Sequence, residues 1–176
     1  MPRLFRALLV GLMVLMWLPA VVLADPGPPT SIVSVQILDY GIYCRPVIDG
    51  TTAAPGTPLG YVNNFSGAPT YRYRQQEVPA LLGISFGLSV VSDISIANVR
   101  VETLRPGATA PDVWFTDLEA GSAHARGFSF DFEDELQMGL WKMEAWDGDT
   151  RLYSIEFDVV APSALPEIGP DCNFLS

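Results

Sequence analysis

Hydrophobic and polar residues alternate with a period of two along much of the chain, most clearly near its end. The runs 140–146 and 151–160 meet at Asp147-Gly148-Asp149. Asp-Gly between two alternating runs is typical of a β-hairpin with a tight turn. One face of this hairpin carries mostly apolar side chains and the other mostly charged ones, so we expect the apolar face to lie on a core.

Short apolar and β-branched runs continue the same pattern upstream. They cover residues 31–38, 40–44, 71–78, 82–91, 96–104, 113–116 and 125–132. Gly and Pro interrupt nearly every junction, and the segments between the runs show no capped apolar stripe of helical period. The pattern predicts an all-β protein, an antiparallel β-sandwich of about seven to nine strands.

The first 24 residues differ in composition from the rest. Arg3 and Arg6 precede the apolar run 7–18, and Ala24 ends the segment just before Asp25. This arrangement predicts a secretory signal peptide at 1–24 and a periplasmic or secreted protein. The alternative is a retained anchor, because 7–24 approaches the roughly 20 residues that span a bilayer.

The remaining residues, 25–176, are expected to form one domain with no membrane span after cleavage. They hold 8 Lys and Arg and 20 Asp and Glu, so their formal charge is 8 − 20 = −12. This acidity argues against nucleic acid as a partner. Residues 45–70 have little periodicity and are rich in Pro and Gly, which indicates a long loop, and 161–176 form a Pro-rich tail.

The two cysteines, Cys44 and Cys172, are far apart in the sequence. In an oxidising compartment an intramolecular disulfide is the simplest expectation, and intermolecular pairing is the alternative. Because the chain has a single His, a Cys/His metal site is not expected.

Several short motifs occur in a defined order, beginning with Asp39-Tyr40-Gly41-Ile42-Tyr43. Gly83-Ile84-Ser85-Phe86-Gly87 follows, then Gly139-x-Trp141 and Phe157-x-Val159. On these motifs the chain resembles a family of uncharacterised exported bacterial domains of unknown function. The resemblance implies an immunoglobulin-like sandwich in the periplasm or outside the cell, and it brings no catalytic residues with it.

The motif at 83–87 also matches the G-x-S-x-G nucleophile elbow, with Ser85 as the nucleophile. His124 would be the general base, with Asp93, Asp112 or Asp117 to orient it. The motif works at a strand–turn–helix junction, however, and the residues after Gly87 continue as a strand. A small serine hydrolase using Ser85 and His124 is therefore the alternative function.

Acidic residues near the end of the chain suggest a second kind of site. Carboxylate oxygens suit Ca²⁺, although the spacing lacks the Asp-x-Asp-x-Asp-Gly pattern of a calcium loop. The candidate calcium ligands are Asp131, Glu133, Asp134, Glu135, Asp147 and Asp149. A solvated acidic loop is the alternative.

Alternating aromatic and cationic residues at 71–74 suggest a ligand-contacting surface. A strand there would place Arg72 and Arg74 on one face, where they could bind a carboxylate or a sugar. Trp114 is a third candidate contact, because it and Phe115 must point to opposite faces of a strand. The sequence as a whole favours a non-catalytic exported binding or accessory module of the bacterial cell envelope, with an unknown protein or carbohydrate partner.

Overall fold

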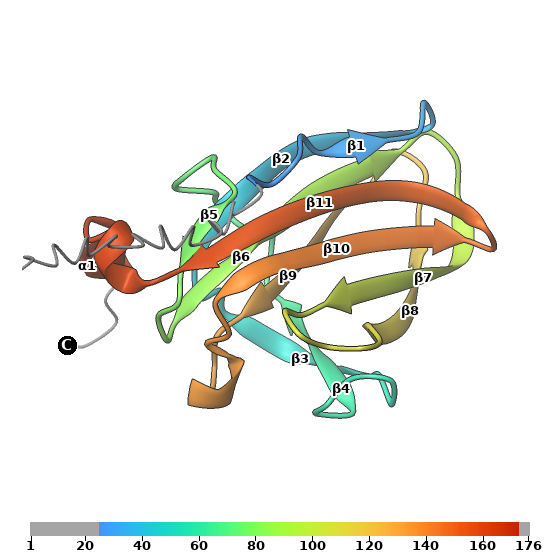
Figure 1. The fold of residues 1–176 in the computed structure, drawn as a ribbon. Helices are drawn as coiled ribbons and strands as arrows, with labels where there is room; N and C mark the ends of the chain where they lie inside the picture. Colours follow the sequence, from blue (N-terminus) through green and yellow to red (C-terminus); the bar gives the residue numbers. More distant parts are fainter. Residues whose placement is uncertain (1–24, 173–176) are drawn as a thin grey trace, which may run out of the picture.

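The computed structural model describes residues 25–172, which are almost entirely β-structure (Figure 1). The signal peptide predicted at 1–24 lies outside the described residues. The strands are β1 (Thr30–Ser31), β2 (Val35–Cys44), β3 (Ile48–Ala53), β4 (Tyr61–Phe65), β5 (Glu77–Pro79), β6 (Ile84–Ser92), β7 (Ile96–Leu104), β8 (Asp112–Leu118), β9 (Ala123–Ser129), β10 (Gly139–Asp147) and β11 (Thr150–Val160). Three short helical turns complete the described chain: η1 (Glu133–Glu135), η2 (Pro162–Ala164) and α1 (Ile168–Asp171).

The strands form two sheets and a separate hairpin. One sheet has the order β1-β11-β10-β7-β8, with β5 beside β11, and the other has the order β2-β6-β9. Every pairing between these strands is antiparallel except that of β5 with β11. The predicted all-β sandwich is thereby confirmed.

The described residues hold more strands than the seven to nine expected, because β1, β3 and β4 carry no alternating pattern. Three predicted runs, in contrast, form fewer strands than expected. Residues 31–38 and 40–44 largely merge into β2, whose register against β6 shifts between Ile37 and Asp39, as at a β-bulge. Of the run 71–78, only its end enters β5.

The segment 45–70, expected as a loop, contains the two-stranded hairpin β3–β4. All six residues of β3 are exposed. Because neither face of this strand is buried, selection for alternation does not act on it, and the period of two that marks the other strands is missing.

The core lies between the two sheets and is dominated by aromatic rings. Trp141 of β10 is fully buried, with its ring centroid 4.9 Å from that of Phe128 on β9 and 5.7 Å from that of Phe86 on β6. Phe86 in turn lies 5.0 Å from Phe157 of β11. The indole Nε1 of Trp141 donates a hydrogen bond to the Gln137 carbonyl at 2.7 Å, so this polar atom is satisfied inside the core.

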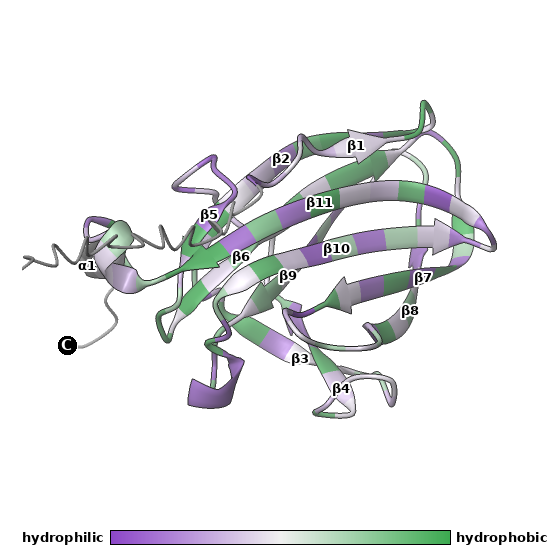
Figure 2. Ribbon diagram, viewed as in Figure 1, coloured by the Kyte–Doolittle hydropathy of each residue, from purple (hydrophilic) through white to green (hydrophobic). Residues whose placement is uncertain are grey.

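The hairpin β10–β11 is formed as the sequence predicts. Its turn includes Gly148, whose φ of 55° is a left-handed conformation that glycine adopts without strain. Hydrophobic and hydrophilic positions alternate along β10 and β11 (Figure 2). On the face away from the core, the Glu144 carboxylate lies 2.8 Å from Lys142 and 3.1 Å from Arg151.

The Pro-rich tail closes one end of the sandwich, where α1 lies in Figure 1. Ile168 of α1 is fully buried. Cys172 follows α1 and forms the predicted disulfide with Cys44 at the end of β2, with the two Cα atoms 5.1 Å apart. None of the helices in the described part of the chain is long and apolar enough to cross a membrane.

Breaking the disulfide should lower the stability of the fold, because the crosslink closes a span of 128 residues. A loop of this length corresponds to about 4–5 kcal/mol of chain entropy in the unfolded state. We expect the midpoint of thermal unfolding, followed by circular dichroism, to fall by about 10 °C or more under reducing conditions. The double variant Cys44→Ser, Cys172→Ser should melt low with or without reductant. An unchanged midpoint on reduction of the native chain would contradict this expectation.

Candidate functional site: a cleft between two sheet edges

A cleft of about 660 Å³ opens where the edges of the two sheets separate. Strands β8 and β9 follow one another in the chain, yet β8 is the edge of the larger sheet and β9 the edge of the smaller one. The cleft lies between these two edges, and the hairpin β3–β4 forms its third wall. Its volume falls within the range of small-molecule binding sites, about 300–1,000 Å³.

The hairpin is held against both sheets. At its turn, the Val113 amide of β8 donates a hydrogen bond to the Gly56 carbonyl at 2.9 Å. A side chain at Gly56 would collide with the backbone of Val113, so glycine permits this approach. At its other end, the ring of Phe65 packs edge-on against buried Tyr43 of β2, with centroids 6.3 Å apart.

The lining of the cleft combines aromatic rings with neutral polar groups. The rings belong to Tyr61, Phe65, Trp114, Phe128 and Phe132. The neutral polar side chains include Thr52, Asn63, Asn64, Thr103 and Thr116. Such a mixture can cover an apolar ligand surface and also hydrogen-bond the polar groups at its margin.

Arg126 of β9 crosses the gap between the two sheets. Its guanidinium lies 5.2 Å from the centroid of the Trp114 ring on β8. Nη2 donates to the Thr116 hydroxyl at 3.3 Å, and Nη1 donates to the Ala125 carbonyl at 2.7 Å. The buried Nε has no hydrogen-bond partner among the described residues. Burial lowers the pKa of Arg126, because it penalises the charged form.

Most of the other charged groups in the cleft have partners within the protein, whereas Asp134 is exposed. Arg105 pairs with Asp112 at 3.1 Å, and Asp131 pairs with Arg45 at 3.1 Å. The buried carboxylate of Glu135 accepts backbone hydrogen bonds from Asp131 at 2.7 Å and Phe132 at 2.9 Å. Burial raises the pKa of Glu135 above its ordinary value in spite of these bonds.

The alternative serine hydrolase site is not formed. Ser85 lies inside β6 rather than at a strand–helix turn, is fully buried, and has its hydroxyl 2.7 Å from that of Ser129. His124 lies five positions from Ser129 along β9, which places it about 17 Å away and on the opposite face of the sheet. Its Nε2 accepts a hydrogen bond from the Glu119 amide at 3.0 Å, so it also lacks a free basic nitrogen directed at Ser85.

The six acidic residues suggested as calcium ligands fall into two separate groups. Asp131, Glu133, Asp134 and Glu135 lie in and before η1, whereas Asp147 and Asp149 lie at the turn beyond β10. The nine residues of β10 separate the groups by about 30 Å. Within residues 25–172, no three His, Cys, Asp or Glu side chains gather as metal ligands. Calcium binding at 131–135 alone stays a prediction.

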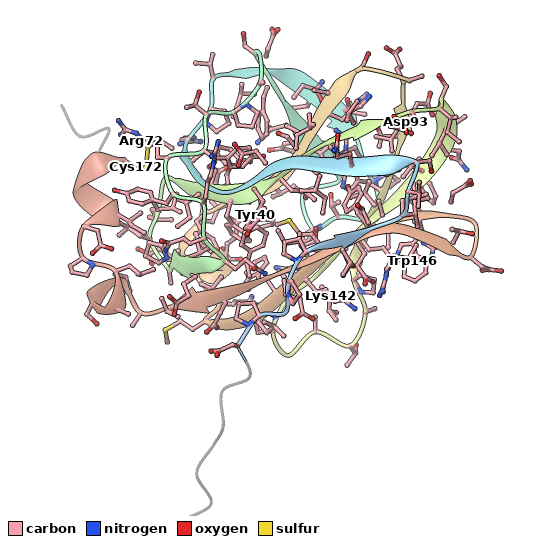
Figure 3. The ribbon with its side chains drawn as sticks, turned by 90° about the horizontal axis from the view of Figure 1, so that it is seen from above. Tyr40, Arg72, Asp93, Lys142, Trp146 and Cys172 are labelled. Atoms are coloured by element: carbon pink, nitrogen blue, oxygen red, sulfur yellow. A yellow bond between two sulfur atoms is a disulfide. The ribbon has the colours of Figure 1, made fainter. Side chains whose placement is uncertain are left out.

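The three suggested ligand contacts do not share one surface. Trp114 lines the cleft, while Phe115 beside it points outward and is 53% exposed. Arg74 is exposed and pairs with Asp39 at 3.0 Å. Arg72 lies at the end of the molecule that carries Cys172 (Figure 3), where its Nη1 is 3.9 Å from the Cys44 sulfur. It lines a second hollow of about 430 Å³ beside the disulfide.

Arg126 is not among the residues that the sequence pattern singles out, although a signal is present. The period of two in β9 places Arg126 on the same face as Phe128, toward the core. A charged residue at an apolar position is informative, because such groups are rarely buried without a partner. The sequence does not show, however, that Arg126 contacts β8 at the edge of the other sheet.

Comparisons with known proteins give no family. No family model matches the sequence, and no curated protein matches it. Among solved structures, an immunoglobulin-like protein, PA1606, from Pseudomonas aeruginosa is 18% identical with a TM-score of 0.45, over 76% of this chain and 98% of that one.

Because Ser85 is buried and bonded to Ser129, a fluorophosphonate probe should not label it. We expect mass spectrometry of the folded chain after treatment to find no adduct at Ser85. The variant Ser85→Ala is the matched control for any background labelling. Stoichiometric modification at Ser85 that disappears in this variant would contradict the geometry described here.

Proposed function

We propose that this chain is a non-catalytic, exported binding module of the bacterial cell envelope, and that the cleft between β8 and β9 binds an oligosaccharide. The observation that carries the proposal is the cleft of about 660 Å³ with aromatic and neutral polar walls. A sugar ring has an apolar face of C–H groups and a margin of hydroxyls. Aromatic rings can cover the first, and amide or hydroxyl side chains can bond the second.

The state of the β9 edge favours a sugar over an extended peptide. A peptide would add to the sheet by pairing with the backbone groups of β9 that point away from β6. One of these is the Ala125 carbonyl, which already accepts a hydrogen bond from Arg126. A charged side chain that points inward also protects a sheet edge from pairing with another chain.

Two features support an exported location. The disulfide between Cys44 and Cys172 suits an oxidising compartment. The basic and then apolar pattern of residues 1–24 is typical of a secretory signal. The acidic composition of the remainder suits a soluble protein that does not adhere to anionic membrane surfaces.

Removing an aromatic ring from the wall of the cleft should weaken binding. We expect the full chain to bind members of an array of neutral and acidic envelope oligosaccharides. The variant Tyr61→Ala should weaken the best hit by roughly three- to tenfold, measured by calorimetric titration, because it removes a stacking surface on β4.

The matched control is Phe115→Ala, which removes an exposed ring of β8 that lies outside the cleft. Both variants should keep the native circular dichroism spectrum. If no oligosaccharide binds, or if Phe115→Ala weakens binding as much as Tyr61→Ala does, the cleft is not an oligosaccharide site.

A further inference from the structure

We propose that the ligand of this cleft carries a carboxylate, as in a sugar of the uronic acid class, and that Arg126 binds that group. The inference rests on the proposed function of the cleft and makes its ligand class more specific. It assigns Arg126 a role in ligand recognition in addition to its contacts within the protein.

The charge of Arg126 points to an anionic ligand. Among residues 25–172, no carboxylate lies within the 4.0 Å of an ion pair with its guanidinium. Arg105 provides a comparison within the same cleft, because it pairs with Asp112. A guanidinium that is largely removed from water and has no counter-ion is costly to the folded state. An anionic ligand would supply the missing partner.

The geometry of the guanidinium suits a carboxylate in particular. The guanidinium lies over the Trp114 ring, and the bonds to Thr116 and Ala125 restrict its orientation. The Nε–H donor remains without a partner. Because the five N–H groups of arginine form a rigid fork, a carboxylate that reaches this buried edge, beside the Thr116 hydroxyl, can bind Nε and Nη2 together.

The groups next to Arg126 do not balance its charge. The aromatic and hydroxyl lining near Trp114 and Thr116 provides no negative charge. Three further carboxylates also line the cleft: Asp131 pairs with Arg45, Glu135 accepts two backbone amides, and exposed Asp134 forms no ion pair with Arg126. The hydroxyl of buried Tyr153 has no hydrogen-bond partner among the described residues, and the positive charge of Arg126 acts on it. Among the described residues that line the cleft, Arg126 is therefore the cation without an ion pair.

The test compares matched sugars that differ only in the acidic group. The full chain is titrated with oligomers of galacturonic, glucuronic and mannuronic acid, and with the corresponding neutral oligomers. At least one acidic oligomer should bind about ten- to a hundredfold more tightly than its neutral counterpart. The advantage should shrink at high salt, because part of it is electrostatic.

Variants at position 126 identify the residue responsible. Arg126→Gln should abolish the preference for the acidic sugar. Arg126→Lys should recover only part of it, because lysine keeps the charge but lacks the planar fork. Arg100→Gln is the control, since Arg100 pairs with Glu102 outside the cleft and should leave the preference unchanged.

A second measurement needs no variant to fold. In the NMR spectrum of the ¹⁵N-labelled native chain, the Arg126 Nε–H signal should shift on addition of the acidic oligomer but not of the neutral one. Assignment can use through-bond correlations from the Arg126 backbone to its side chain in the native chain. A shift confined to other arginines would overturn the proposal.

The outcomes also separate this inference from the proposed function. Equal affinity for acidic and neutral oligomers, still sensitive to Tyr61→Ala, would overturn the role of Arg126 and leave oligosaccharide binding intact. Binding of a simple organic acid such as succinate as tightly as the sugars, dependent on Arg126, would keep the carboxylate anchor and overturn the oligosaccharide. No binding and no shift at Nε would overturn both.

Discussion

The unequal width of the two sheets is the constraint on which the rest of the structure depends. A sheet of three strands cannot cover one of six. The ring contacts place β6 and β9 over β10 and β11, where Phe86, Phe128, Trp141 and Phe157 fill the space between the layers. Edge strand β8 therefore extends past the covered region. Strands β8 and β9 follow one another in the chain but belong to different sheets. The two sheets are therefore not closed against each other between these edges, and an open corner remains there. The hairpin β3–β4 borders this corner without filling it, and the cleft is what remains.

Arg126 connects the two sheet edges at this corner, but it also places an unpaired charge there. Its side chain spans the gap, packs on Trp114 and bonds to Thr116. It therefore connects the edges of two sheets between which the described strands form no backbone pairing. An apolar residue could have filled the same space without bringing a charge out of water. A buried ion gives little net stability unless it is paired, since desolvation offsets its interactions. A guanidinium at this position is thus poorly explained by stability alone, which is why a ligand that completes its pairing accounts better for the arrangement.

Sequence predicted those parts of the fold in which one face of a strand is buried. The β10–β11 hairpin follows from its Asp-Gly turn and alternating faces, and the pairing of Cys44 with Cys172 follows from their number and the expected compartment. The hairpin β3–β4 could not be predicted in this way, because an exposed strand such as Ile48–Ala53 shows no alternation. Ser85 and His124 illustrate the limit for sites. Each belongs to a plausible motif or role, but strand register sets them on opposite faces of one sheet. Trp114 was identified only as half of an alternating pair, whereas its partner Arg126 depends on a contact between sheets that local pattern does not encode.

The walls of the cleft are held in place before any ligand arrives. Gly56 joins the hairpin turn to β8, and Phe65 packs on Tyr43 at the other end. The guanidinium of Arg126 is restricted by its contact with Trp114 and its two hydrogen bonds. The disulfide reinforces the same region, because Cys44 ends β2 only four residues before β3 begins. Binding to such a site orders few protein side chains, and each ordered side chain would otherwise cost roughly 0.5–1.5 kcal/mol of affinity. Selectivity then depends on whether the ligand matches donors whose positions are already set. The Nε–H of Arg126 is the donor that discriminates most, because it has no partner among the described residues. A neutral hydroxyl can accept its hydrogen bond, but only an anion can also balance its charge.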